Sequence, residues 1–232
     1  MKGRLTYGSG GILIGLVAGF FAANSLNRQA LSGPASSLGS ETSTVTSSLP
    51  NTPNSQSGGM QADVTQTLEK AEKEPNNFVA QMLAGDMYAQ IGKFDKAVEF
   101  YKRGIVLNGE NLQANVVLAN ALFDSQRFEE AEVYYAKALQ IDPRNVNALT
   151  DLGTTFVERK QPDYDRAILE YKKALQIDPK SSTTIYYLGI AHLRKGEKQE
   201  AERTLTELEK LGAASELVTR LRQNISQGST IQ

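Results

Sequence analysis

Residues 145–180 read NVNALTDLGTTFVERKQPDYDRAILEYKKALQIDPK, and this stretch sets the architecture because its pattern recurs along the chain. Gly153 has counterparts in Gly85, Ala119 and Gly189, at intervals of 34, 34 and 36 residues. Two further columns keep the same period: Ala97, Ala131, Ala167 and Ala201, and Asn77, Asn111, Asn145 and Ser181. Three independent columns with one period indicate four tandem copies of one structural unit.

The residue types in these repeats resemble those of the tetratricopeptide repeat (TPR) family, whose unit is a pair of helices, A and B. Helix A of the family carries Leu-Gly and an aromatic residue, helix B carries Ala and an aromatic residue, and Pro ends the unit. Repeat three matches with Leu152, Gly153, Phe156, Ala167, Tyr171 and Pro179. The resemblance covers residues 75–213 and implies an all-α, right-handed α-solenoid of four TPR helix pairs, at about 77–110, 111–144, 145–180 and 181–213.

Local signals predict where the helices begin and end. The Asn and Ser column is well placed to cap the four A helices. Asp142-Pro143 and Asp178-Pro179 are expected to end helix B, because Pro cannot continue a helix. Repeat three is two residues longer than the others, and the extra residues fall in the segment 158–165.

Both ends of the solenoid are predicted to be closed by an extra helix. Residues 62–74 are predicted to form an N-terminal capping helix. Residues 214–226 are predicted to form a C-terminal capping helix after Gly212, followed by a tail at 227–232. Its apolar seam would be Leu217, Leu221 and Ile225, with Arg220 and Arg222 turned outward.

Residues 1–28 are predicted to be a transmembrane helix. No charge lies between Arg4 and Arg28, and an uncharged window of this length can cross the hydrocarbon core. The alternative is a cleaved signal peptide, for which Ala23-Asn24-Ser25 offers a small-x-small exit. Small residues every four positions would form a packing ridge for self-association through this helix: Gly11, Gly15, Gly19 and Ala23.

The charges that flank this segment predict its orientation. Lys2 and Arg4 precede it and Arg28 follows it, so the positive-inside tendency places the N-terminus in the cytoplasm. The repeats would then lie on the extracytoplasmic (periplasmic) side of a cell inner membrane, as part of a single-pass protein. Residues 29–61, rich in Ser, Thr, Gly and Pro, are predicted to be a flexible, disordered linker.

Composition excludes several classes of function. The chain has no cysteine and one histidine, His192, which occupies the aromatic position of repeat four and is expected to pack. From Gln61 onward 22 basic residues face 25 acidic ones, which is not the footprint of a nucleic-acid-binding protein. We therefore expect no enzyme activity, no cofactor, no metal site and no nucleic-acid partner.

The family resemblance implies a partner-binding groove lined by the A helices. Members that clamp a C-terminal carboxylate carry Lys and Arg where this chain has Met82, Val116 and Thr150, so no such clamp is expected. A peptide with apolar and basic side chains would suit the lining better. The predicted groove residues are Met82, Asp86, Gln90, Val116, Asn120, Asp124, Thr150, Thr154, Glu158, Tyr186 and Arg194.

Two functional hypotheses follow from this organisation. The first is a membrane-anchored TPR adaptor or scaffold that holds a protein or peptide partner near the bilayer, as an assembly or biogenesis factor of the cell envelope. The second is a soluble secreted or periplasmic TPR binding protein whose signal peptide is removed. The repeats specify the fold in both cases and do not name the partner.

Overall fold

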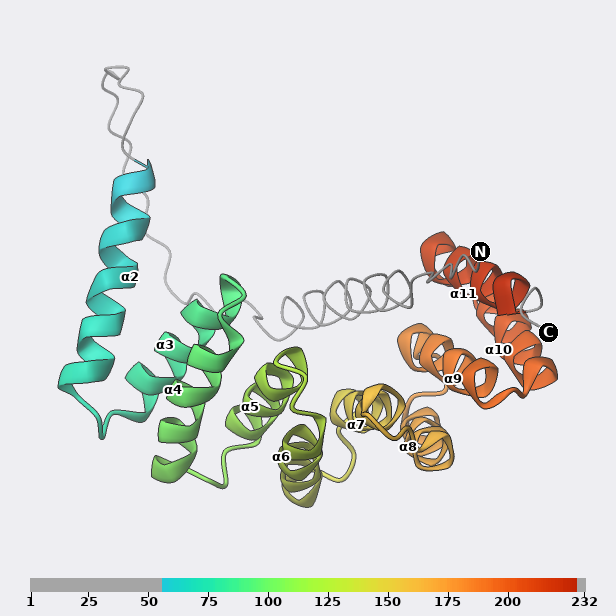
Figure 1. The fold of residues 1–232 in the computed structure, drawn as a ribbon, viewed down its shortest axis with the longest axis horizontal. Coiled ribbons are helices and arrows are strands. Elements are labelled where there is room, and N and C mark those ends of the chain that lie inside the picture. Colours follow the sequence, from blue (N-terminus) through green and yellow to red (C-terminus); the bar gives the residue numbers. More distant parts are fainter. Residues whose placement is uncertain (1–55, 229–232) are drawn as a thin grey trace, which may run out of the picture. The chain divides into compact units, whose positions relative to one another are not determined.

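A computed structural model describes residues 56–228, which belong to one compact unit of the chain. This described range holds ten α-helices, named α2 to α11, as Figure 1 shows. None of them combines the length and hydropathy that a membrane-crossing helix requires. The predicted span at 1–28, its packing ridge and residues 29–55 of the predicted linker lie outside the described residues.

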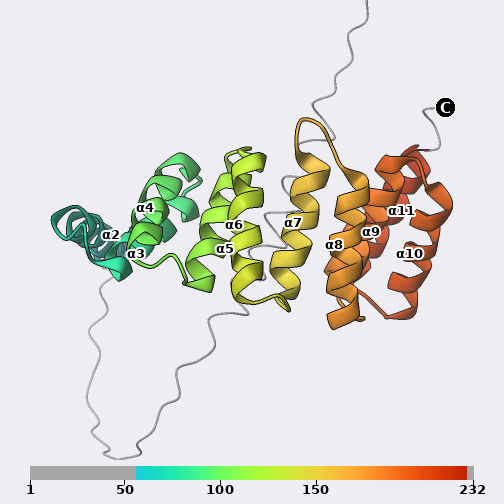
Figure 2. The same ribbon diagram turned by 90° about the horizontal axis from the view of Figure 1, so that it is seen from below.

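The eight central helices form the four predicted pairs, and the all-α solenoid is confirmed. Each helix A packs on the helix B that follows it, and each helix B packs on the next helix A. The helices lie side by side in chain order (Figure 2). The A helices are α3 (Phe78–Gln90), α5 (Leu112–Asp124), α7 (Val146–Glu158) and α9 (Ser182–Lys195). The B helices are α4 (Phe94–Leu107), α6 (Phe128–Ile141), α8 (Tyr164–Ile177) and α10 (Lys198–Lys210).

The predicted helix caps are confirmed. The side chains of Asn77, Asn111 and Asn145 accept hydrogen bonds from backbone N–H groups three residues on, at 2.9–3.1 Å. Ser181 does the same at 3.4 Å. Each such cap is worth about 1 kcal/mol, because it satisfies a backbone donor that the helix cannot. Helices α6 and α8 end directly before the two Asp-Pro pairs.

A glycine and a tyrosine hold the helix pairs of repeats one and three together. A Cβ atom added to Gly153 of α7 would lie 2.6 Å from a ring carbon of Tyr171 on α8. Gly85 of α3 meets the ring of Tyr101 in the same way. Both tyrosines are fully buried. In these two pairs the helices approach closely because the glycine carries no side chain, and the buried ring fills the space beside it.

The turns between helix A and helix B differ in one respect that the sequence predicted. The turn in repeat three spans residues 159–163, whereas the turns of repeats one and two span 91–93 and 125–127. The two extra residues thus lie in this turn. Gly92 and Gln126 occupy equivalent places with φ of +70° and +60°, a left-handed conformation that glycine adopts at little cost and glutamine does not.

The first helix is longer than predicted. Helix α2 spans Gln56–Lys73, so it begins inside the segment predicted as linker rather than at residue 62. The Ser and Gly residues at its start disfavour a helix locally. Its second half packs on α3 through Leu68 and Ala71, and extending a nucleated helix adds one hydrogen bond per residue. Packing thus propagates the helix backward through residues that would not nucleate one.

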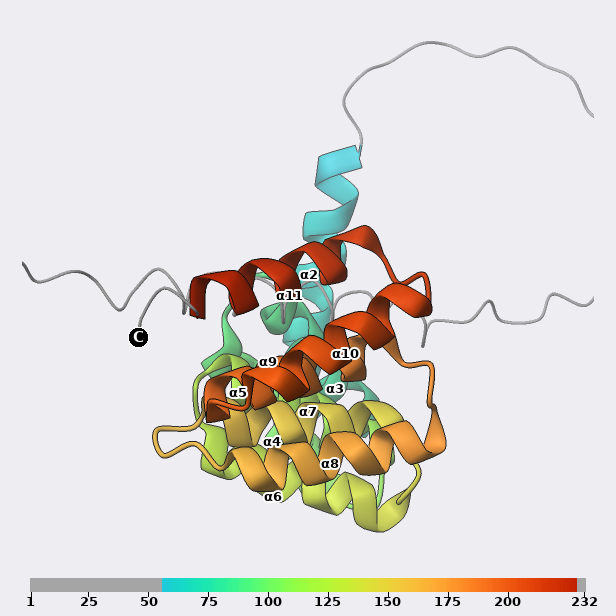
Figure 3. The same ribbon diagram turned by 90° about the vertical axis from the view of Figure 1, so that its right-hand side faces the viewer.

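The last helix closes the C-terminal end. Helix α11 (Ser215–Gly228) packs on α9 and α10, as the end-on view shows (Figure 3). It follows Gly212, whose φ of +63° ends α10 in the predicted manner. Leu221 and Ile225 are buried. Helix α11 has the place of a further helix A, and the side that would face a further helix B is exposed and polar. The residues on that side are Thr219, Arg222, Gln223 and Ser226, which lie one period after Ile185, Leu188, Gly189 and His192.

Candidate functional site

The A helices form one continuous surface. Figure 1 shows α5, α7 and α9 on the inner side of the curved stack, with α6, α8 and α10 behind them. The predicted groove residues all lie on these A helices and on α3. We call this the helix-A surface. The structure then shows which of these side chains are engaged within the protein.

Three predicted groove residues at the same position of repeats one to three form hydrogen bonds with tyrosine hydroxyls of helix B. The hydroxyl of Tyr101 donates to Asp86 Oδ1 at 2.5 Å, and that of Tyr135 donates to Asn120 Oδ1 at 2.6 Å. In repeat three, Tyr171 and Thr154 share a hydrogen bond of 3.0 Å. Asp86, Asn120 and Thr154 therefore stabilise the helix pairs, and their role in partner binding stays a prediction.

Polar side chains link repeats three and four across the helix-A surface. Thr150 Oγ1 and Thr184 Oγ1 are 2.8 Å apart, and Arg194 Nη1 lies 2.9 Å from Glu158 Oε1. Burial raises the pKa of the Glu158 carboxyl, and Arg194 partly offsets that rise. Tyr186 is buried beside α11, and burial raises its pKa. This end of the surface is thus held in place by contacts within the chain.

Five predicted groove residues are buried and Met82 is half-buried; the buried five are Val116, Asn120, Thr150, Thr154 and Tyr186. Val116 is buried among Ala138 and Ala148 in a core cluster. Met82 packs against Gly104 of α4, where its sulfur would lie 2.7 Å from an added Cβ. Gln90, by contrast, is exposed. Apolar character alone did not separate a groove residue from a core residue at these positions.

Sequence reasoning missed Asp151, which lies on α7 between two buried leucines, Leu149 and Leu152. Its Oδ2 atom is buried and makes no hydrogen bond to any described residue. Burial raises the pKa of Asp151 to about 7, and the charge of Asp124 adds to the rise. A carboxyl placed within an apolar helix segment was the sequence signal that could have marked it.

Sequence reasoning also missed two exposed aliphatic residues on α3. Val79 is 61% exposed and Leu83 is 46% exposed, although both lie on a helix A. Their positions within the repeat are those of Gln113 and Val117 in repeat two, of which Val117 is buried. The 34-residue period pairs Val79 with the exposed Gln113 but Leu83 with the buried Val117, so it does not predict the exposure of Leu83.

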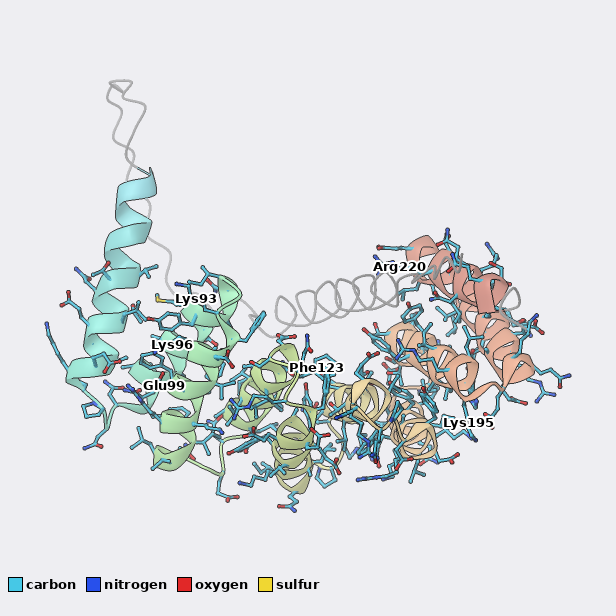
Figure 4. The ribbon with its side chains drawn as sticks, in the orientation of Figure 1. Lys93, Lys96, Glu99, Phe123, Lys195 and Arg220 are labelled. Carbon is cyan, nitrogen blue, oxygen red and sulfur yellow. The ribbon has the colours of Figure 1, made fainter. Side chains whose placement is uncertain are left out.

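A hollow of about 410 Å³ lies between the first two turns of the solenoid. It is lined by both turns and by the start of α4, where Figure 4 labels Lys93 and Lys96. Asp95 and Asp124 line it as well, so it carries charges of both signs. Lys96 is bound to Glu99 at 3.0 Å. Of the predicted groove residues, Asp124 borders this hollow.

No metal-binding cluster is found among residues 56–228. His192 is buried at the aromatic position of repeat four, and its Nδ1 lies 2.6 Å from Glu197 Oε2 in the turn that follows. Lys195 reaches the same carboxylate and also contacts Asp165 at 2.8 Å. His192 therefore packs in the core and holds the turn between α9 and α10 in place through its contact with Glu197.

Family profiles described as tetratricopeptide repeat match residues 79–111, 113–145 and 158–225, which together exceed half of the chain. No curated protein matches it. Among solved structures, MamA is 22% identical with a TM-score of 0.61, over 67% of this chain and 90% of MamA. A MamA fragment from Desulfovibrio magneticus is 20% identical with a TM-score of 0.61, over 67% and 87% of the two chains.

A thermophilic TPR protein in Thermus thermophilus is 19% identical with a TM-score of 0.57, over 72% of this chain and 91% of that one. Likeness at these identities establishes the fold alone. The repeat matches, the helix pairs and the residue columns agree with one another. The chain therefore belongs to the tetratricopeptide repeat family.

Proposed function

We propose that the chain is a membrane-anchored scaffold that binds a segment of another protein on its helix-A surface and catalyses no reaction. The observation that carries the proposal is that surface itself, which is made by the A helices of four successive repeats. Each repeat from one to three contributes a carboxyl group to it, from Asp86, Asp124 and Glu158 respectively. A partner segment with basic and apolar side chains fits this lining best.

The anchor and the location rest on the sequence of residues 1–61. An uncharged apolar window precedes a polar, Ser- and Thr-rich segment, which supports a span followed by a tether. The scaffold would then hold its partner on the extracytoplasmic side of the inner membrane, in the assembly of an envelope complex. Helix packing through Gly11, Gly15, Gly19 and Ala23 would add self-association.

A second candidate is a soluble secreted or periplasmic binding protein. The short apolar segment and the exit at Ala23-Asn24-Ser25 favour it. Intact-mass measurement of the protein from its native membrane separates the two. A full-length mass supports the anchor, and loss of the first 25 or so residues supports the cleaved form. A reporter fused to the C-terminus gives the orientation, and a cytoplasmic signal would contradict the proposed location.

The binding surface is tested by adding positive charge at two of its predicted positions. Gln90→Lys with Asp124→Lys places two cations on neighbouring helices A. The matched control is Gln140→Lys with Glu110→Lys, which makes the same charge change at exposed positions away from this surface. Partners are crosslinked in native membranes and quantified by mass spectrometry.

The groove variant should capture at least tenfold less of the main partner, because two unfavourable charge contacts cost on the order of 1–2 kcal/mol. The control should capture the normal amount. Equal capture by wild type and groove variant would exclude the helix-A surface as the binding site.

A further inference from the structure

In repeat four, helix A turns one face toward the preceding repeat. Tyr187 of α9 stacks on Tyr171 of α8 with ring centroids 6.4 Å apart, and it is buried. Thr184, on the same side of α9, bonds Thr150 of α7. These contacts identify the face of a helix A that receives the repeat before it.

On α3 the equivalent face is open to solvent. Leu83 occupies the position of Tyr187 and is nearly half exposed, and Val79 lies one turn before it and is 61% exposed. With Met87 on α3 and the exposed Ile91 directly after it, they follow an i, i+4 spacing. Such a row forms a ridge about 18 Å long, of the kind that packs into the groove of another helix.

The repeat before α3 is incomplete, and this leaves Leu83 exposed where its counterparts Val117 and Tyr187 are buried. Val79 takes a position that is exposed in repeats two and three as well. Glu74-Pro75 follows α2 in the way that Asn108-Gly109 follows helix B of repeat one, one period later, and Asp142-Pro143 follows helix B of repeat two. Helix α2 therefore has the place of a helix B. Within residues 56–228 no helix A precedes α2. The residues one period before α3, 44–55, contain Pro50 and Pro53 and no aromatic residue, so they do not match the helix-A pattern.

We propose that a helix of a partner protein docks on this ridge beside α2, in the place that a preceding helix A would take. The contact would continue an arrangement already present within the chain, where α7 packs beside α5 and α9 beside α7. The partner helix must carry an aliphatic face to cover Val79 and Leu83. A second copy of the chain fits less well, since its own α3 is flanked by its own α2.

The test uses the full-length chain in zwitterionic lipid nanodiscs, with empty nanodiscs as background. The probe is a labelled 18-residue peptide with Leu and Ala on one helical face and alternating Glu and Lys on the other. A scrambled peptide of the same composition has no apolar face. Binding is measured by fluorescence anisotropy for Val79→Gln with Leu83→Gln, and for the control Val133→Gln with Leu169→Gln. The control residues are 50% and 52% exposed on α6 and α8.

The wild-type chain should bind the amphipathic peptide at least tenfold more tightly than the scrambled one. The α3 variant should lose at least tenfold in affinity, because two aliphatic side chains no longer leave water, and the control should stay within twofold. Equal binding of both peptides, an α3 variant within twofold of wild type, or equal losses in both variants would overturn the proposal. A dimer of the chain that only the α3 variant dissociates would overturn it too, by making a second copy the occupant.

Discussion

The two ends of the described solenoid differ in the side chains that they expose to solvent. At the C-terminal end, α11 buries Leu221 and Ile225 and turns Arg222 and Gln223 outward. At the N-terminal end, α3 exposes Val79 and Leu83 although α2 lies beside it. A repeat array needs polar end faces to stay soluble, and an exposed aliphatic ridge marks a place for another molecule. The difference indicates that one end is finished and the other is completed by a partner.

The largest expected effect contrasts two leucines at the two ends. Leu221→Ala should lower the free energy of unfolding by about 3 kcal/mol, because it leaves a cavity at a fully buried site. Leu83→Ala should cost less than about 1 kcal/mol, since the side chain is nearly half exposed. Urea denaturation of the two variants measures both. Equal losses would show that the ends are equally packed.

The second prediction concerns the buried carboxyl of repeat three. The folded-state pKa of Asp151 is raised to about 7, above its usual value near 3.8. The folded state therefore holds this proton more tightly, and stability falls as pH rises from about 4 to 7. Asp151→Asn should remove that fall and stabilise the protein at pH 8 by on the order of 2 kcal/mol.

Thermal melts of wild type and Asp151→Asn from pH 4 to pH 8 check this. The gain should shrink toward zero as the pH approaches 4. A gain that does not change with pH would mean that the carboxyl titrates normally. Leu83 occupies the position of Asp151 in repeat one, so Leu83→Asp is the matched control and should keep an ordinary carboxyl pKa in its exposed site.

The third prediction compares two turns in the N-terminal half. Gln126 adopts a left-handed φ of +60° where the preceding repeat has Gly92. Gln126→Gly should raise the free energy of unfolding by about 1 kcal/mol, and Gly92→Ala should lower it by a similar amount. Chemical denaturation gives both values. The same sign for both substitutions would refute the strain at Gln126.

The smallest effect tests the ion pair between repeats three and four. Glu158 and Arg194 pair at 2.9 Å, whereas the same position holds Gln90 and Asp124 in repeats one and two. A double-mutant cycle with Glu158→Gln and Arg194→Met should give a coupling of about 0.5–1 kcal/mol. A coupling near zero would mean that the pair does not hold the two repeats together.

The fold could be read from the sequence because its determinants are local and periodic. Gly153, Ala167 and the Asn145 cap each act within one helix pair, so a column of residue types is enough to find them. The start of α2 could not be read, because packing of Leu68 and Ala71 on α3 extends a helix into residues that do not favour one.

The binding surface could be read only in part. Position within the repeat identified the helix-A residues, but it did not show that Tyr101 and Tyr135 would bind Asp86 and Asn120. Those contacts depend on how far a side chain from helix B reaches across the pair. The exposure of Leu83 depends on a missing neighbour, which no pattern within its own repeat can show.

Amide hydrogen exchange of the full-length chain tests most directly whether the two ends of the solenoid are packed to different degrees. Amides of α9, which is covered by both α8 and α11, should exchange close to the slowest rate in the protein. Amides of α3 should exchange at least tenfold faster, and should slow when the aliphatic helical peptide is added. Equal protection of α3 and α9, unchanged by the peptide, would contradict the account.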